Sequence, residues 1–181
     1  MVPAKDINGR EIPGIFELAD PWDTLDAWKD DPRFKIVDID YMRAKGPCYA
    51  RNLLQRNYDG EEYTLQIDSH TRFAENWDEE HINMLVDLQN RGYKKPLLTS
   101  YACEYNPEKE PEGRNMIPLH LVFDRFSPEG IMHLKPHSID DYQSRDMPVP
   151  ARIYSAHYAF TLGVFCKEVP HDPEIYFHGE E

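Results

Sequence analysis

The sequence has few cysteines and few basic side chains, and each shortage excludes a class of protein. The three cysteines among 181 residues, Cys48, Cys103 and Cys166, are odd in number and form no CxxC pair. Neither a disulfide framework nor a zinc knuckle is therefore predicted. Lys and Arg total 20 against 33 Asp and Glu, for a formal net charge of -13. A chain this acidic repels phosphate backbones, which argues against nucleic-acid binding.

Long apolar segments are also absent. No run approaches the roughly 20 apolar residues that a membrane-spanning helix needs. Residues 1–10 lack the basic start and apolar centre of a secretory signal. Because the cysteines suggest no disulfides, a reducing cytoplasm is the expected location. A content of 40% hydrophobic and 29% charged residues predicts one soluble globular domain over residues 1–181.

The middle of the chain alternates short apolar runs with helical patterns. Strands are predicted at residues 34–39, 63–67 and 96–101. Helices are predicted to begin at Pro47 and near Asp78, where the apolar residues recur at helical spacing. This strand–helix alternation predicts an α/β fold with a largely parallel sheet.

The flanking regions are less regular. Asn8-Gly9 and Pro13-Gly14 predict turns, and Asp20-Pro21 predicts the start of a helix. The second half, rich in proline, is predicted to contain three more strands, at residues 117–123, 130–134 and 152–165.

The triplet Asp68-Ser69-His70 follows the predicted strand at 63–67. Ligands of open α/β sheets bind beyond the carboxyl ends of strands. Asp68 and His70 are two residues apart and would point the same way on extended backbone, where a carboxylate and an imidazole could hold a divalent cation. Alone the pattern is weak, since acidic residues and histidines at strand ends are more often turn or cap residues.

Segments on both sides of the triplet form an ordered set of motifs. Residues 44–51 are A-K-G-P-C-Y-A-R, residues 58–78 are Y-D-G-E-E-Y-T-L-Q-I-D-S-H-T-R-F-A-E-N-W-D, and residues 168–181 are E-V-P-H-D-P-E-I-Y-F-H-G-E-E. The set resembles the cytoplasmic hydroxyproline N-acetylglucosaminyltransferases and, more distantly, the polypeptide N-acetylgalactosaminyltransferases. Three motifs in this order are much more specific than any one of them.

The resemblance implies a GT-A fold, which is a Rossmann-like nucleotide-diphospho-sugar transferase fold. It implies retaining transfer of N-acetylglucosamine from UDP-GlcNAc, with Mn²⁺ or Mg²⁺, to a hydroxyl of a protein or peptide. Residues 34–101 would be the nucleotide- and metal-binding part, and residues 115–181 the acceptor-side part. The implied roles are metal binding by Asp68 and His70, donor contacts by Arg43, Lys45, Gly46, Arg51, Ser69 and Phe177, and sugar- or acceptor-side catalytic contacts by Glu180 and Glu181.

The sequence departs from the family pattern at both ends. The apolar strand and S-x-R-D motif that form the uridine pocket have no counterpart between Met1 and Trp22. A later histidine that supplies the third metal ligand is also missing. An incomplete domain is therefore expected, one that a partner chain would complete by covering the open sheet edge. The alternative is a non-catalytic remnant of such a domain.

Histidines in the second half leave a further alternative open, a metal-dependent oxygenase of the β-barrel class. None of them forms an H-x-H pair. His157 is the strongest metal-ligand candidate among them, because it lies on a predicted strand near the acceptor-side segment. The histidines concerned are His120, His133, His137, His157, His171 and His178.

Overall fold

The chain folds as two compact units, Met1–Arg43 and Ala44–Glu181. Within the part of the chain that is described, no helix combines the length and the apolar character needed to cross a membrane. The computed structural model describes residues 2–5, 11–17, 28–68, 71–109 and 112–176.

The first unit contains a two-stranded antiparallel sheet. Strand β1 (Val2–Lys5) pairs with β2 (Glu11–Glu17). The turn predicted at Pro13-Gly14 is wrong, because both residues lie within β2. Both strands of a two-stranded sheet are edge strands, and edges tolerate proline. The turn predicted at Asn8-Gly9 and the helix predicted after Asp20-Pro21 lie outside the described residues.

The strand predicted at residues 34–39 is also wrong. These residues pair with no strand among the described residues, and their backbone has no regular hydrogen bonding. Phe34 packs instead on the Trp28 ring, with centroids 4.9 Å apart, and a short 3-10 helix follows at Tyr41–Arg43. A run of apolar residues becomes a strand only where a neighbouring strand completes its hydrogen bonds.

The second unit is built on a three-stranded sheet of β3 (Tyr63–Ile67), β4 (Leu97–Thr99) and β7 (Tyr158–Leu162). Strand β7 lies between β3 and β4 and is antiparallel to both. The prediction that the fold mixes helices and strands is confirmed, but the prediction of a largely parallel sheet is wrong. The two early strands do run in the same direction, as their helical connection predicts, yet β7 separates them.

Helix α3 (Trp77–Asn90) covers one face of this sheet and forms the core. Leu85 is fully buried and packs with Leu98 of β4 and Phe160 of β7. The helix ends at the predicted place, where Gly92 has a φ of +99°. Partly buried side chains that complete this core are Tyr63, Leu65, Trp77, Ile82, Leu88 and Tyr158.

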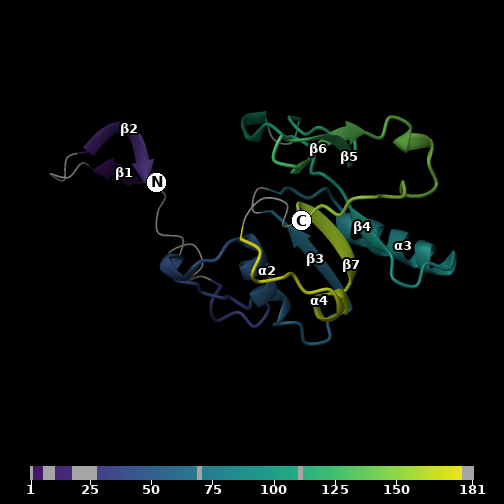
Figure 1. Cartoon of the computed structure of the whole chain (residues 1–181), viewed down its shortest axis with the longest axis horizontal. Helices are drawn as coiled ribbons and strands as arrows, with labels where there is room; N and C mark the ends of the chain where they lie inside the picture. The colour runs from purple at the N-terminus through teal and green to yellow at the C-terminus, as the bar shows by residue number, and fades with distance from the viewer. Residues whose placement is uncertain (1, 6–10, 18–27, 69–70, 110–111, 177–181) are drawn as a thin grey trace. The chain divides into compact units, whose positions relative to one another are not determined.

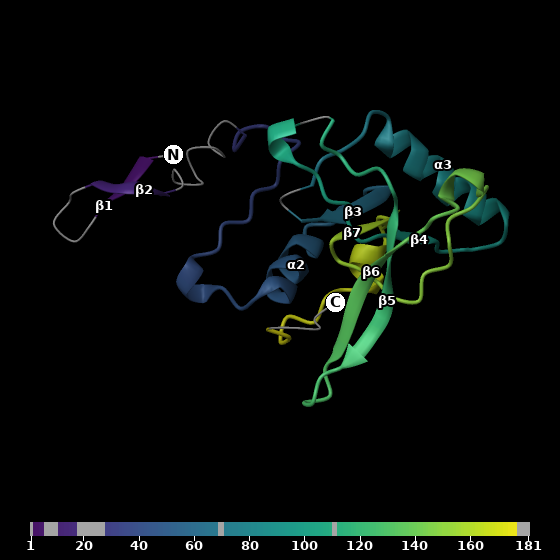
Figure 2. The ribbon, with the colours of Figure 1, turned by 90° about the horizontal axis from the view of Figure 1, so that it is seen from above.

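Helix α2 (Pro47–Gln55) lies on the opposite side of the sheet from α3, as Figures 1 and 2 show. The side chains of Thr64, Gln66 and Thr161, which alternate with the core residues, point to this side. The α2 face of the sheet is therefore polar, whereas the α3 face is apolar.

Strands β5 (Leu119–Phe126) and β6 (Met132–Ser138) form a separate antiparallel hairpin, which Figure 2 shows extending beyond the three-stranded sheet. Ser100, directly after β4, donates from its Oγ to the Leu119 carbonyl at 2.8 Å, and this hydrogen bond links the hairpin to the three-stranded sheet. Two of the three strands predicted in this half are thus confirmed with shifted bounds, and the third is shorter than predicted. The remaining short helices are α4 (Phe165–Glu168) and 3-10 turns at Pro107–Lys109 and Tyr142–Ser144.

Tyr158 gives the fold a testable pH dependence. Burial raises the pKa of Tyr158 to about 12, above about 10 for an unfolded tyrosine. Its stabilising contribution is complete below pH 10 and is lost as the pH rises through 12. Because the side chain is partly exposed, the expected loss is only about 1 kcal/mol. Urea unfolding at pH 9 and 11.5 measures the fall in the free energy of unfolding between the two pH values. This fall should be smaller for Tyr158→Phe than for the wild type, whereas the exposed control Tyr93→Phe should match the wild type.

Candidate functional site

Asp68 lies directly after β3, and its carboxylate contacts two cationic or hydrogen-bonding groups. Its Oδ2 is 2.7 Å from Nδ1 of His157, and its Oδ1 is 4.0 Å from Nη2 of Arg51 on α2. Ile67 pairs with Tyr158, so Asp68 and His157 occupy the next opposite positions of the two strands. The β3–β7 register therefore brings together residues that are 89 positions apart in the sequence.

The loop that carries His157 is fixed by hydrogen bonds to both neighbouring strands. The Ser155 backbone N–H donates to Oγ1 of Thr99 at 2.9 Å, and that hydroxyl donates to the Ser155 carbonyl at 3.2 Å. Gln66 Nε2 donates to the Ala156 carbonyl at 3.1 Å. Ser155 and Ala156 are buried, so the imidazole of His157 projects from an anchored loop.

A cavity of about 430 Å³ separates α2 from the polar face of the sheet. Asp68 and Arg51 line it together with uncharged polar side chains. Its size is within the range that small-molecule sites occupy. The remaining polar lining side chains include Gln55, Thr64, Gln66, Tyr154 and Thr161.

Gly46, at the N-cap of α2, is in contact with the backbone near the end of the described chain. Its φ is +91°, and a Cβ built there would lie 2.4 Å from the Tyr176 carbonyl oxygen. The same segment is bound along α2, where Asn52 Nδ2 donates to the His171 carbonyl at 2.7 Å and Gln55 Oε1 accepts the His171 N–H at 2.8 Å. The segment before residues 177–181 therefore packs on the helix that carries Arg51.

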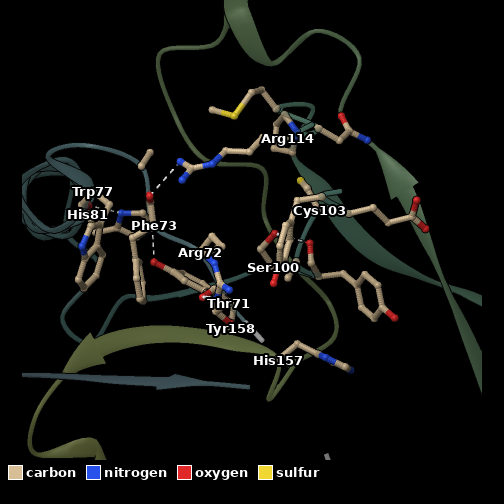
Figure 3. Close-up of a pocket in the computed structure, with 18 residues that line it drawn as sticks. Thr71, Arg72, Phe73, Trp77, His81, Ser100, Cys103, Arg114, His157 and Tyr158 are labelled. Carbon is tan, nitrogen blue, oxygen red and sulfur yellow. Dashed lines mark hydrogen bonds between the residues drawn. The ribbon is translucent and has the colours of Figure 1, made fainter. Parts of the chain in front are cut away.

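A second, larger cavity of about 660 Å³ is lined by His157 and by residues of α3, whereas Asp68 lines the smaller one. Figure 3 shows Phe73, Trp77 and His81 on one side of it, with His157 at the lower end of the view. Arg114 Nη1 donates to the Phe73 carbonyl at 3.0 Å. Other lining residues that bear on its chemistry are Arg72, Ser100, Tyr101, Cys103, Glu104 and Tyr105.

Aromatic rings and two guanidinium groups, of Arg72 and Arg114, line the larger cavity. The Arg72 guanidinium lies 5.2 Å from the centre of the Tyr105 ring, within cation–π range. Tyr158 O–H is 3.0 Å from Nε2 of His81, and this geometry fits a tyrosine that donates to the imidazole. Burial raises the pKa of the Cys103 thiol, which keeps that side chain protonated.

The structure brings some of the predicted site residues together and leaves others undescribed. Arg51 and Asp68 meet at one site, and Lys45 lies 5.6 Å from the Tyr49 ring at the start of α2. Arg43 belongs to the first unit. The predicted residues Ser69, His70, Phe177, Glu180 and Glu181 lie outside the described residues.

A divalent cation beside Asp68 would need further ligands in addition to this carboxylate. Within the described ranges, no group of three or more His, Cys, Asp or Glu side chains converges. Asp68 supplies a partly exposed carboxylate oxygen, the donor type that Mn²⁺ and Mg²⁺ prefer. A carboxylate of this kind fits a cation that takes its other ligands from phosphate oxygens, water and residues outside the described set.

The family model for glycosyltransferases of the GlcNAc type matches residues 28–181. The chain belongs to this glycosyltransferase family. No curated protein and no solved structure matches it significantly. Membership in the GlcNAc glycosyltransferase family establishes a sugar transferase at the level of class, and it favours that class over the oxygenase alternative.

Sequence reasoning missed the two features that define the site's geometry. The sequence suggests His157 only as a metal ligand, whereas the structure makes it the hydrogen-bond partner of Asp68. The larger cavity was not predicted, because Arg72, Tyr101 and Tyr105 come from loops whose contacts follow no sequence period. A prediction that β7 pairs with β3 would have revealed the Asp68–His157 pair.

Proposed function

We propose that this chain is a metal-dependent, retaining glycosyltransferase of the GT-A type. It would transfer N-acetylglucosamine from UDP-GlcNAc to a hydroxyl of a protein or peptide. The observation that carries the proposal is the placement of Asp68, in a family member, between Arg51 and His157 at the end of β3. Asp68 would bind Mn²⁺ or Mg²⁺ with His70, and Ser69 would contact the donor.

The smaller cavity supports a donor site. Arg51 is only 16% exposed and lies on the α2 side of Asp68, where a guanidinium would offset the charge of a diphosphate. A bound cation would neutralise charge that develops on the departing diphosphate. Lys45 and Gly46, directly before α2, would contact the donor. Phe177, Glu180 and Glu181 would contact the sugar or acceptor.

The larger cavity supports an acceptor site, because His157 lines it while contacting the Asp68 carboxylate. An acceptor hydroxyl in this cavity would approach the donor from the side of the strand end that faces away from α2. The aromatic walls of this cavity suit the side chains of a peptide.

Calorimetric titration with UDP-GlcNAc and Mn²⁺ tests this proposal, with two arginine variants as a matched pair. Arg51→Ala should weaken binding about 10- to 100-fold, since it removes a charge-assisted contact to the diphosphate. Arg72→Ala removes the same side chain from the larger cavity and should change donor affinity less than about twofold. Absence of Mn²⁺-dependent binding by the wild type, or equal losses in both variants, would contradict the proposal.

A further inference from the structure

His157 contacts Asp68 through one particular nitrogen and one particular oxygen. The contact runs from Nδ1 to Oδ2 at 2.7 Å, which is the length of a charge-assisted hydrogen bond. An ionised carboxylate only accepts hydrogen bonds, so the geometry requires a proton on Nδ1 of His157. The other carboxylate oxygen, Oδ1, faces Arg51 at 4.0 Å. The two oxygens of Asp68 therefore have different partners on different elements.

The surroundings of His157 also restrict its imidazole ring. Tyr101 packs against the ring with centroids 4.7 Å apart at an interplanar angle of 54°. The two preceding residues are buried, and their carbonyls accept hydrogen bonds from Thr99 and Gln66. A side chain held by backbone and ring contacts loses little freedom when it binds a carboxylate, so it can fix the orientation of that carboxylate.

We propose that His157 is a positioning residue for Asp68. Its Nδ1 binds Oδ2 of the Asp68 carboxylate and thereby directs Oδ1 toward the cation. The inference rests on the proposed function, because it assigns a role at the same metal site. On this account His157 is not itself a ligand, and its effect on metal affinity passes through the Asp68 carboxylate. Ligating carboxylates with such outer hydrogen bonds typically lose 10- to 100-fold in metal affinity when the partner is removed.

The choice of nitrogen makes the inference testable with three substitutions. The side-chain amide nitrogen of asparagine lies near the position of Nδ1, whereas that of glutamine lies near the position of Nε2. His157→Asn should therefore retain Mn²⁺ affinity within about threefold. His157→Ala and His157→Gln should each lose about 10- to 100-fold. The readout is free Mn²⁺ measured by electron paramagnetic resonance in titrations with and without UDP, with thermal unfolding as a check that each variant is folded.

The possible results separate this inference from the proposed function. If the wild type binds no Mn²⁺ with or without UDP, the proposed function fails and the inference fails with it. If the wild type binds Mn²⁺ and folded His157→Ala binds equally well, only the positioning role is overturned. A variant series in which glutamine restores affinity and asparagine does not would overturn it too, since it would indicate direct ligation through Nε2.

Discussion

Replacing Asp68 by asparagine is expected to weaken Mn²⁺-dependent binding of UDP-GlcNAc at least about 100-fold, or about 2.7 kcal/mol. The substitution keeps the size of the side chain but removes the negative charge that a divalent cation needs. It also removes the charged partner of Arg51 and His157. Calorimetry with UDP-GlcNAc, in Mn²⁺ and again in excess EDTA, measures the loss.

The control for this substitution is Asp78→Asn. Asp78 is an exposed acidic residue in the first turn of α3 and lines neither cavity. Its loss of charge should leave donor affinity unchanged. Wild-type affinity in the Asp68 variant would show that the carboxylate at the end of β3 does not support donor binding.

Substituting Gly46 by alanine is expected to destabilise the second unit by about 3 kcal/mol. Gly46 has φ 91° and ψ 176°, a backbone region that essentially only glycine adopts, and a residue with a Cβ held there costs about 1–3 kcal/mol. The added methyl group would also lie 2.4 Å from the Tyr176 carbonyl oxygen, and such overpacking costs about 1–3 kcal/mol. Urea unfolding of the full chain measures the sum.

Gly60→Ala separates the two causes. Gly60 has a similar φ of 96°, but a Cβ there would meet nothing within 4 Å. This variant should lose only the conformational part, about 1–2 kcal/mol. Equal losses in the two variants would mean that the contact between Gly46 and the Tyr176 backbone contributes nothing to stability.

Local elements of this fold could be predicted from the sequence because their signals are local. Strand β3 has the predicted bounds, Tyr63–Ile67, and α3 ends before Gly92 as its apolar period indicates. The apolar run at residues 34–39 carried the same kind of signal without forming a strand. What separates these segments is a pairing partner, and only β3 has one in β7.

The sheet topology and the site geometry could not be predicted in the same way. The insertion of β7 between β3 and β4 depends on contacts between segments about 60 to 100 residues apart in the chain. The Asp68–His157 pair follows from that register alone. Gly46 was predicted as a donor contact from its motif, and the structure adds a packing contact with Tyr176 that the motif does not reveal.

The most direct test of the account is to locate the cation. Crystals of the full chain grown with UDP-GlcNAc and Mn²⁺ should give an anomalous diffraction peak at the manganese edge, within coordination distance of Asp68 Oδ1 and of the donor's diphosphate. The peak should disappear in crystals of Asp68→Asn. A donor bound without any peak beside Asp68, or a manganese site elsewhere in the chain, would contradict the assignment of this strand end as the metal and donor site.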